Sequence, residues 1–221
     1  MSTSLGIGKL NPSRLSLAVA LVLSLGFSSR AIAEAPVLGS SELVTEAPHA
    51  AGRRIQGLIA AAQEGDPQVQ YILGLCCMTG RGVPRDPSEA LRWLGKAADK
   101  GLAEAQYALG CCYNGEDGFA KDSARAVKCW EKAALQGHVE AQYCLALSYF
   151  AGEGIAESHL EAVKWWRKAA EQNHADAQYY LGVCYSHGLG VPKARDQAIF
   201  WLRKALAGGN GDAPALLAEL K

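Results

Sequence analysis

The sequence predicts an all-α fold: a right-handed α/α superhelical solenoid of four helix-turn-helix repeats, with a half-repeat cap at each end. The main observation is an internal repeat, because nearly the same stretch begins at Ala103, Val139 and Ala175, each 36 positions after the last. A more divergent copy ends its turn at Gly82 in the same register. Within each copy, apolar residues recur every three or four positions in two stretches separated by a turn, which is the period of an α-helix.

The chain begins with a stretch that we interpret as an export signal, residues 1–33. Lys9 and Arg14 give it a positive start, and an apolar run of 13 residues follows from Leu15 to Phe27. That run is too short to serve as a membrane anchor. Ala31-Ile32-Ala33 then has the small-residue spacing of a cleavage site. A buried N-terminal helix is the alternative, but it does not explain why these features occur in this order.

Residues 34–52 mix Pro, Ser, Gly and Ala without apolar periodicity, and we expect a flexible linker there. Removal of residues 1–33 takes away three of the 22 basic residues and none of the 22 acidic ones. The resulting acidic excess and the predicted export both argue against nucleic acid as a partner. We expect the signal to be cleaved after Ala33. The mature protein should then be periplasmic or secreted, with no stable membrane insertion.

The repeat domain is predicted to cover residues 53–221. Arg53 to Gly65 matches the second helix of a repeat and forms the first cap. Asp212 to Leu220 matches the start of a first helix and forms the last cap. Each complete repeat consists of a helix A, a turn that contains glycine, and a helix B. The four complete repeats are predicted at residues 66–101, 102–137, 138–173 and 174–209.

Capping residues mark where the B helices begin and end. Asp86, Asp122 and Ser158 occupy one equivalent position and predict N-caps for the first three B helices. Ala194 takes that position in the fourth repeat and has no side chain that can cap. The B helices are expected to end in a left-handed residue, a conformation that glycine adopts freely and asparagine tolerates. These residues are Gly101, Gly137, Asn173 and Gly209.

Small residues recur at the positions where helices A and B should cross. A glycine inside a helix costs about 0.5–1 kcal/mol relative to alanine. Its return every 36 residues therefore indicates close packing that offsets this cost. On helix A these positions are Gly74, Gly110, Ala146 and Gly182.

These motifs resemble the Sel1-like repeats (SLR), a family of α/α repeats related to the tetratricopeptide repeat. The family pattern places A-x-A-x-x-x-L-G-x-x-Y on helix A, x-x-G-x-G in the turn, and A-x-x-W and K-A-A-x-x-G on helix B. The stretches AEAQYALGCCY from Ala103 and ADAQYYLGVCY from Ala175 follow the first part, and EAVKWWRKAAEQN from Glu161 follows the last. The likeness extends from Arg53 to Leu220.

The resemblance implies an exported scaffold that mediates protein–protein interaction through the concave face of its A helices. Some exported bacterial members of the family inhibit a secreted toxin or enzyme, interact with a host, or assist envelope assembly, and all three roles stay open. A cysteine-rich branch is described as penicillin-binding with β-lactamase activity. A cell-wall hydrolase of that type is therefore the alternative function.

No catalytic motif is present in the sequence. None of its serines has a lysine three positions later, as the S-x-x-K motif of serine β-lactamases requires, and H-E-x-x-H is absent. The five histidines are scattered. His138 and His174 share an equivalent position just after helix B, where we expect solvent-facing loop residues. We therefore predict no enzyme activity, no catalytic residue and no cofactor.

Seven cysteines occur in the chain, and four of them form the adjacent pairs Cys76-Cys77 and Cys111-Cys112. Neighbours on a helix point about 100° apart, so one pair cannot easily give both thiolates to one zinc ion, and no metal site is predicted. Export would permit disulfides, but an odd count leaves at least one thiol unpaired within the chain. The resemblance implies a staple between helices A and B of each repeat, and this chain lacks a repeated pair for it. The other three are expected to act as small apolar residues: Cys129, Cys144 and Cys184.

The B helices carry a row of basic residues, which we interpret as a solvated outer face because acidic residues interrupt the charge. Contact with an anionic surface is the alternative. The row consists of Lys96, Lys132, Lys168 and Lys204.

The A helices carry apolar and aromatic residues on the arc opposite the predicted core, where an outward face should be polar. We interpret this stripe as a groove for a protein or peptide ligand. Burial of the stripe between repeats is the alternative, above all for its tyrosines. The predicted partner-binding residues are Tyr71, Leu75, Tyr107, Cys111, Tyr143, Leu147, Phe150, Tyr179, Val183 and His187.

We expect the protein recovered from its native host to begin at Glu34, because cleavage after Ala33 removes the signal. N-terminal sequencing of protein from the periplasm or the culture medium measures this directly. Recovery from the cytosol of a chain that still carries Met1 would contradict the prediction.

Overall fold

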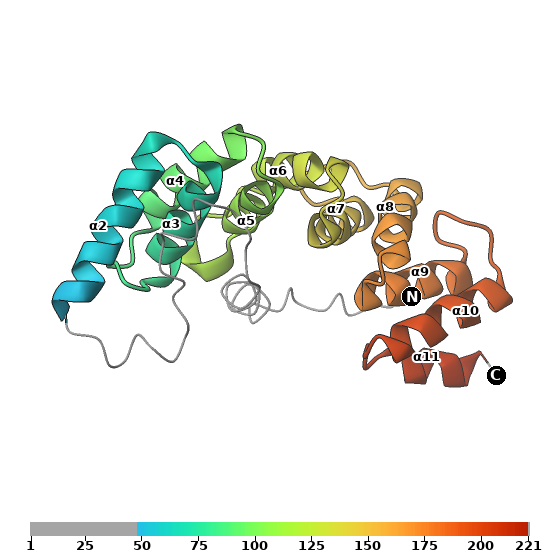
Figure 1. The fold of residues 1–221 in the computed structure, drawn as a ribbon. Coiled ribbons are helices and arrows are strands. Elements are labelled where there is room, and N and C mark those ends of the chain that lie inside the picture. The colour runs from blue at the N-terminus through green and yellow to red at the C-terminus, as the bar shows by residue number, and fades with distance from the viewer. Residues whose placement is uncertain (1–47, 221) are drawn as a thin grey trace. The chain divides into compact units, whose positions relative to one another are not determined.

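The computed structural model of the protein describes residues 48–220, which form ten α-helices and one short 3-10 helix (Figure 1). The chain divides between Trp93 and Leu94 into two units. The first unit contains α2 (Pro48–Glu64), α3 (Pro67–Thr79) and the start of α4 (Pro87–Asp99). The second contains the end of α4 and then α5 (Ala103–Tyr113), η1 (Glu116–Gly118), α6 (Ser123–Leu135), α7 (Val139–Ala151), α8 (His159–Glu171), α9 (Ala175–His187), α10 (Arg195–Ala207) and α11 (Ala213–Glu219).

The helices alternate as the repeats predict, and the α/α solenoid class is confirmed. Helices α3, α5, α7 and α9 are the A helices, and α4, α6, α8 and α10 are the B helices. In the second unit, each helix A packs against the helix B that follows it. Helices α6 and α8 also pack against the next helix A, and α10 packs against α11. None of the helices within residues 48–220 is long and apolar enough to cross a membrane.

Helix α2 begins at Pro48, so the last five residues of the linker predicted at 34–52 belong to a helix. Proline fits the first position of a helix, and the alanines that follow it have high helix propensity. The predicted signal, residues 1–33, and the rest of that linker lie outside the described residues.

The caps predicted for the B helices are confirmed. Asp86 accepts hydrogen bonds from the backbone N–H groups of Ser88 and Glu89 at 2.9 and 3.1 Å. Asp122 and Ser158 each accept one from the third residue of α6 and α8. Helix α10, which follows Ala194, has no side-chain cap. Each of these bonds satisfies an N–H group of the first turn that has no partner within its own helix.

Glycines in the A-to-B turns allow one repeat to contact the repeat before it. Gly154 and Gly190 have φ angles of +73° and +67°, which L side chains rarely adopt. A Cβ atom at Gly154 would overlap the carbonyl group of Ser123, and one at Gly190 would overlap that of His159. Each turn therefore lies against the first residue of the preceding helix B. The predicted left-handed helix ends are confirmed as well, including Asn173 with a φ of 66°.

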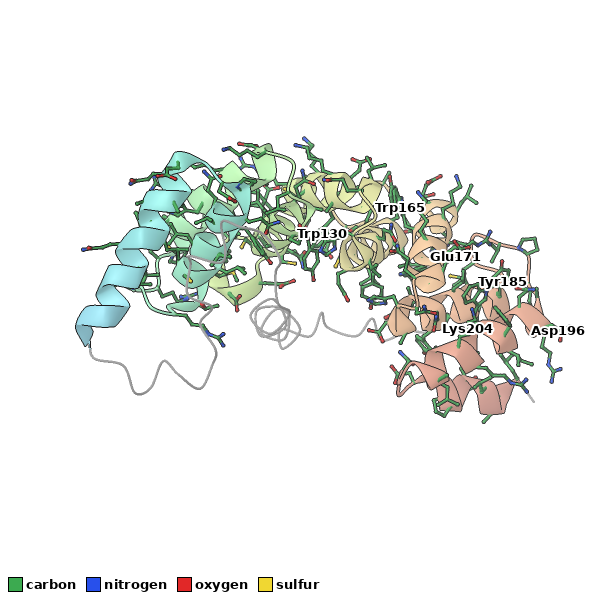
Figure 2. All side chains as sticks on the ribbon, viewed as in Figure 1. Trp130, Trp165, Glu171, Tyr185, Asp196 and Lys204 are labelled. Atoms are coloured by element: carbon green, nitrogen blue, oxygen red, sulfur yellow. The ribbon has the colours of Figure 1, made fainter. Side chains whose placement is uncertain are left out.

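The core forms where large residues of helix B meet small residues of helix A. Trp130 on α6 is 3% exposed, and a Cβ atom at Gly110 would overlap its indole ring (Figure 2). Leu202 takes the equivalent position on α10, and a Cβ atom at Gly182 would lie 2.7 Å from its Cγ. The close approach predicted at these two glycines is confirmed, since any larger residue would push the helices apart.

A buried glutamine links each helix A to the helix B before it. Gln142 on α7 is 3% exposed and donates from Nε2 to the carbonyl oxygen of Ala134 on α6 at 3.2 Å. The bond joins two repeats, because α6 ends the second repeat and α7 begins the third. Equivalent bonds run from Gln70 to Ala62, from Gln106 to Ala98 and from Gln178 to Ala170.

A second glutamine extends this link in two of the repeats. Gln172, just after α8, donates to Oε1 of Gln142 at 2.9 Å, and Gln136 donates to Gln106 at 2.8 Å. Gly208 stands at this position after α10, and Oε1 of Gln178 is buried with no hydrogen-bond partner among the described residues. Gln142 is therefore bonded to α6, which precedes it, and to the residue that follows α8. Gln178 is bonded only to α8, which precedes it.

Replacement of Gln142 by alanine should destabilise the protein more than the same replacement at Gln178. The first change removes two hydrogen bonds and the second removes one, and a typical bond contributes about 0.5–1.5 kcal/mol. We expect the free energies of unfolding in urea to differ by about 1 kcal/mol between the two variants. Equal losses would show that the bond from Gln172 adds no stability.

Candidate functional site

The predicted partner-binding residues differ widely in exposure. Four of them belong to the core, which corrects their assignment as contact residues: Tyr71, Leu75, Cys111 and Val183 are 7%, 6%, 1% and 5% exposed. The apolar arc of an isolated helix A does not reveal which of its residues the neighbouring helices cover. The other six lie on α5, α7 and α9, and we call their surface the A face: Tyr107, Tyr143, Leu147, Phe150 and Tyr179, which are half-buried, and His187, which is exposed.

Two tyrosines of the A face rest on histidine rings of the next repeat. Tyr107 stacks on His138 with ring centres 4.7 Å apart, and Tyr143 stacks on His174 at 4.6 Å. His174 is only 8% exposed and His138 is half-buried, so the prediction of solvent-facing loop residues is wrong. A stacked aromatic pair contributes about 0.5–1.5 kcal/mol beyond area burial, and here it holds the tyrosine rings in place.

The same histidines are the N-caps of α7 and α9. Nδ1 of His138 accepts a hydrogen bond from the backbone N–H of Ala141 at 3.2 Å, and Nδ1 of His174 accepts one from Ala177 at 3.1 Å. A ring nitrogen that accepts a hydrogen bond carries no proton, so each of these caps requires a neutral imidazole with its proton on Nε2. Nε2 of His174 in turn donates to Glu140 at 3.1 Å.

Asparagine makes the equivalent bonds before α11. Oδ1 of Asn210 accepts from the backbone N–H of Ala213 at 3.0 Å, and its Nδ2 donates to Asp176 at 2.9 Å. Asp176 occupies the position of Glu140 one repeat later, so both side chains link a helix start to the previous helix A. Asp66 caps α3 in the first unit. Sequence reasoning missed these helix A caps, although cap-forming residues recur there at the repeat period.

Contacts with α8 hold Phe150 of the A face and Tyr180 beside it. The ring of Phe150 lies 4.7 Å from that of His159 and 5.3 Å from that of Trp166. Tyr180, the neighbour of Tyr179, stacks on Trp166 with ring centres 4.9 Å apart and planes 9° apart. Because Trp166 is fully buried, these aromatic residues rest on a fixed support. These contacts fix the position of Phe150 within the A face.

The A face has no Lys or Arg on its own helices. The second residue of each of α5, α7 and α9 is acidic. Residues three positions apart lie on the same side of a helix, so each carboxylate neighbours a tyrosine. The pairs are Glu104 and Tyr107, Glu140 and Tyr143, and Asp176 and Tyr179.

The B helices carry the basic side chains of the repeats. Lys164 pairs with Glu161 at 2.6 Å, and the ammonium group of Lys168 lies 3.9 Å from the centre of the Trp165 ring. Lys204 lies 5.2 Å from the ring centre of Trp201 in the same way; Figure 2 labels Trp165 and Lys204. Their lysines already interact with carboxylates and aromatic rings of the same helices, which supports the interpretation as a solvated outer face.

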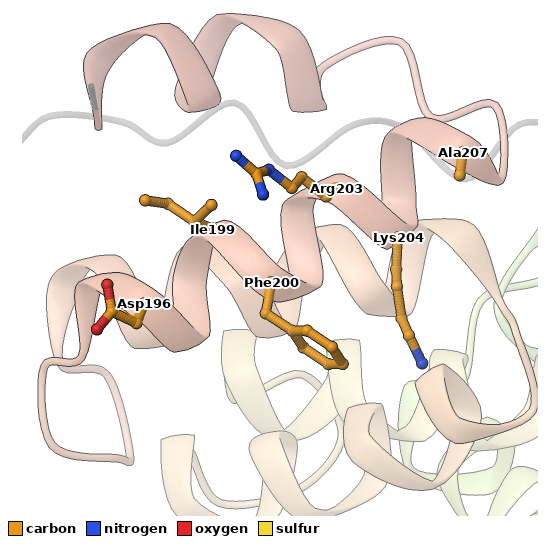
Figure 3. Close-up of a pocket in the computed structure, with 6 residues that line it drawn as sticks. All are labelled: Asp196, Ile199, Phe200, Arg203, Lys204 and Ala207. Atoms are coloured by element: carbon orange, nitrogen blue, oxygen red, sulfur yellow. The ribbon is translucent and has the colours of Figure 1, made fainter.

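A surface hollow of about 590 Å³ lies on α10 (Figure 3). Ligand sites usually have polar groups that converge from several elements. Here all the lining residues come from one helix, so the hollow is an open depression on the helix surface. Phe200 and Lys204 point to the same side of α10. The lining residues are Asp196, Ile199, Phe200, Arg203, Lys204 and Ala207.

A contact between a hydroxyl and an imidazole on α9 lacks the properties of a catalytic pair. Oγ of Ser186 lies 2.6 Å from Nδ1 of His187. Both atoms also lie against the carbonyl oxygen of Val183, at 2.9 and 3.1 Å, and Ser186 is 5% exposed. A nucleophile needs access to its substrate and a base that a third group orients. The hydroxyl of Ser186 is instead buried and donates to the main chain.

All seven cysteines are free thiols. Cys144 and Cys184 are buried apolar residues, as predicted, whereas Cys129 is half-buried. Burial raises the pKa of Cys76 to about 11 and those of Cys112 and Cys184 to about 12, so these thiols are protonated and unreactive near neutral pH. Among residues 48–220, no group of three or more His, Cys, Asp or Glu side chains is placed to hold a metal ion.

The repeated hairpins, their left-handed helix ends and the capped junctions define an α/α solenoid repeat protein. The chain belongs to the Sel1 repeat family, whose model matches residues 67–102, 103–138, 139–174 and 175–210. These bounds lie one residue after those predicted from the sequence. Sel1 repeat proteins generally act as non-catalytic scaffolds for protein interaction.

Two of the solved structures that resemble the chain are more than a quarter identical to it and have TM-scores above 0.7. A Sel1 repeat protein from Oxalobacter formigenes is 31% identical with a TM-score of 0.71, and the match covers 76% of this chain and 69% of that one. A protective antigen present in uropathogenic Escherichia coli strains, which displays an SLR fold, is 30% identical with a TM-score of 0.74. That match covers 96% of this chain and 44% of the antigen. Comparison with curated proteins finds no match.

Iodoacetamide should modify Cys76 about 100-fold more slowly than an exposed cysteine. Burial raises the pKa of Cys76 from the ordinary value of 9.0 to about 11, which lowers its thiolate fraction near neutral pH by about two powers of ten. Mass spectrometry after timed labelling of the reduced, folded protein measures the rate, and labelling in urea gives the reference. A rate close to that of the unfolded protein would mean that the thiol is accessible and ionised.

Proposed function

We propose that the protein is an exported scaffold that binds a segment of another protein along its A face. The observation that carries this proposal is the row of half-buried tyrosines, Tyr107, Tyr143 and Tyr179, of which two rest on stacked histidines. Rigid aromatic side chains offer a large contact area at a low entropy cost, and they are frequent anchors of protein interfaces. The general role of Sel1 repeat proteins as interaction scaffolds supports the same function.

The charge of the A face favours a partner segment with basic residues. Its carboxylates lie one helical turn from the tyrosines, and α5, α7 and α9 contain no Lys or Arg. Glu140 and Asp176 each accept one bond, from His174 and Asn210, and a carboxylate can accept several. A partner arginine or lysine can pair with the carboxylate and lie over the tyrosine ring. Packed helices lie about 8–10 Å apart, and an extended chain advances about 3.3 Å per residue. An extended partner would therefore present a basic residue at about every third position.

Export is part of this proposal and is supported by the charged start, the apolar run and the cleavage motif within residues 1–33. Three exported roles suit such a scaffold: inhibition of, or immunity to, a secreted toxin or enzyme, contact with a host, and envelope assembly. The alternative of a penicillin-binding hydrolase has no accessible, activated nucleophile to support it among residues 48–220, so we propose a protein without enzymatic activity.

Selection from a random peptide library tests the proposed binding. Phage that display random dodecapeptides are selected on the immobilised protein, and the enriched sequences should be rich in Arg, Lys and aromatic residues. One enriched peptide is then labelled, and its Kd is measured by fluorescence polarisation. Enrichment of acidic peptides, or of no sequence beyond those that an unrelated bait selects, would contradict a binding site on the A face.

The variant Glu104→Lys should weaken binding of the enriched peptide by about tenfold, because it replaces an attractive charge by a repulsive one. Glu104 is exposed at the start of α5, so the change removes no core contact. Glu131→Lys is the matched control, since Glu131 is an exposed residue of the B helix α6 and the net charge changes equally. Equal weakening by both variants would indicate general charge attraction instead of a site on the A face.

A further inference from the structure

Histidine is an unusual N-cap residue, and it occupies that position at both ends of the third repeat. His138 caps α7 and His174 caps α9, whereas Asp66 caps α3 and Asn210 binds the start of α11. The preferred N-cap residues are Ser, Thr, Asp and Asn, whose capping oxygens keep their lone pairs near neutral pH. Histidine alone has an ordinary side-chain pKa between pH 5 and 8. The two junctions of the third repeat are thus built on imidazole rings, whose capping atom can take up a proton.

We propose that protonation of His138 and His174 releases these two caps and loosens the junctions on either side of the third repeat. The neutral rings accept the N–H groups of Ala141 and Ala177 at Nδ1, at 3.2 and 3.1 Å. A protonated imidazole carries a hydrogen on both nitrogens, so a ring N–H would then face a backbone N–H. The ring has to leave the cap position, and the first turn of the helix loses an acceptor.

The groups around His138 do not remove this conflict. Tyr107 and Glu104 come from α5 and Glu140 comes from α7, while the preceding α6 ends beside it in Gln136, which does not titrate. Burial lowers the pKa of His138, and the attraction of Glu104 and Glu140 opposes that shift. A histidine whose pKa falls on folding contributes stability above its ordinary value of 6.5, and this stability is lost as the pH falls below that value.

His174 differs from the first histidine in having a bonded carboxylate. From α7, Glu140 accepts from its Nε2 at 3.1 Å and Tyr143 stacks on its ring. Asp176 follows on α9, and α8 ends beside it in Gln172. Glu140 bonds to Nε2 and the tyrosine ring covers one face of the imidazole, but neither supplies the lone pair on Nδ1 that the cap requires. The cap is therefore lost on protonation here too.

Release of the caps also acts on the A face. Tyr107 and Tyr143 stack on the two imidazole rings, so a ring that leaves the cap position also leaves its tyrosine. Acidification would therefore change the arrangement of two tyrosines in the row. This inference goes beyond the proposed function and needs no partner, because it can be tested on the protein alone.

Amide hydrogen exchange at pH 7.5 and pH 5.0 tests the proposal. Protection factors correct each amide for the intrinsic pH dependence of exchange. We expect those of Ala141 and Ala177 to fall about fivefold more than that of Ala213, as the loss of a cap worth about 1 kcal/mol implies. Ala213 is the matched control, because its amide donates to Asn210, which does not titrate. Equal changes at all three amides would overturn the proposal.

Asparagine at both histidine positions provides the second test, because Asn210 fills the equivalent position in the next repeat. In the His138→Asn, His174→Asn variant, the protection factors of Ala141 and Ala177 should stay within about twofold between the two pH values. If the double variant does not fold, the single His138→Asn variant takes its place. In that variant the protection factor of Ala141 should stay constant between the two pH values, while that of Ala177 should still fall. A pH dependence in the folded variant equal to that of the wild type would also overturn the proposal.

Discussion

A buried glutamine amide is present at every junction between a helix B and the next helix A of the second unit, and the spacing of the helices there depends on it. The Nε2 group of Gln142 spans the gap between α7 and the carbonyl of Ala134 on α6, and Gln106 and Gln178 make the same bond in their repeats. The last four carbonyls of a helix have no partner within that helix, so they are available to such a side chain. A bond of fixed length at this point sets how closely helix A of one repeat can lie to helix B of the one before.

Given that spacing, one side chain at each junction can serve several purposes at once. His174 caps α9, bonds to Glu140 of α7 and supports the ring of Tyr143. In the proposed function, stability and recognition therefore depend on the same residues. The tyrosines that are accessible to a partner are also part of the packing between repeats, which explains why an apolar face remains ordered without being fully buried.

The sequence predicted the features that depend on local residue types. A period of 36 residues gave the hairpins, and single residues such as Asp122 and Asn173 gave the helix ends, because capping and left-handed turns need particular side chains. The burial of Cys111 and Val183 was not predicted, since it depends on packing between helices and not on their own helix. The cap at His138 was missed because its acceptor is a ring nitrogen, whose orientation toward the backbone only the structure shows.

The repeats of the second unit are not equally well held together internally, and the difference comes from a residue without a side chain. Gln106 and Gln142 each receive a bond from the glutamine that follows helix B of the same repeat, but Gly208 cannot supply one to Gln178. Repeats that contact only their neighbours respond to load one interface at a time. Under tension along the chain, the two helices of the fourth repeat would separate before those of the second and third repeats. A single glycine thus gives mechanical unfolding of this unit a preferred starting point.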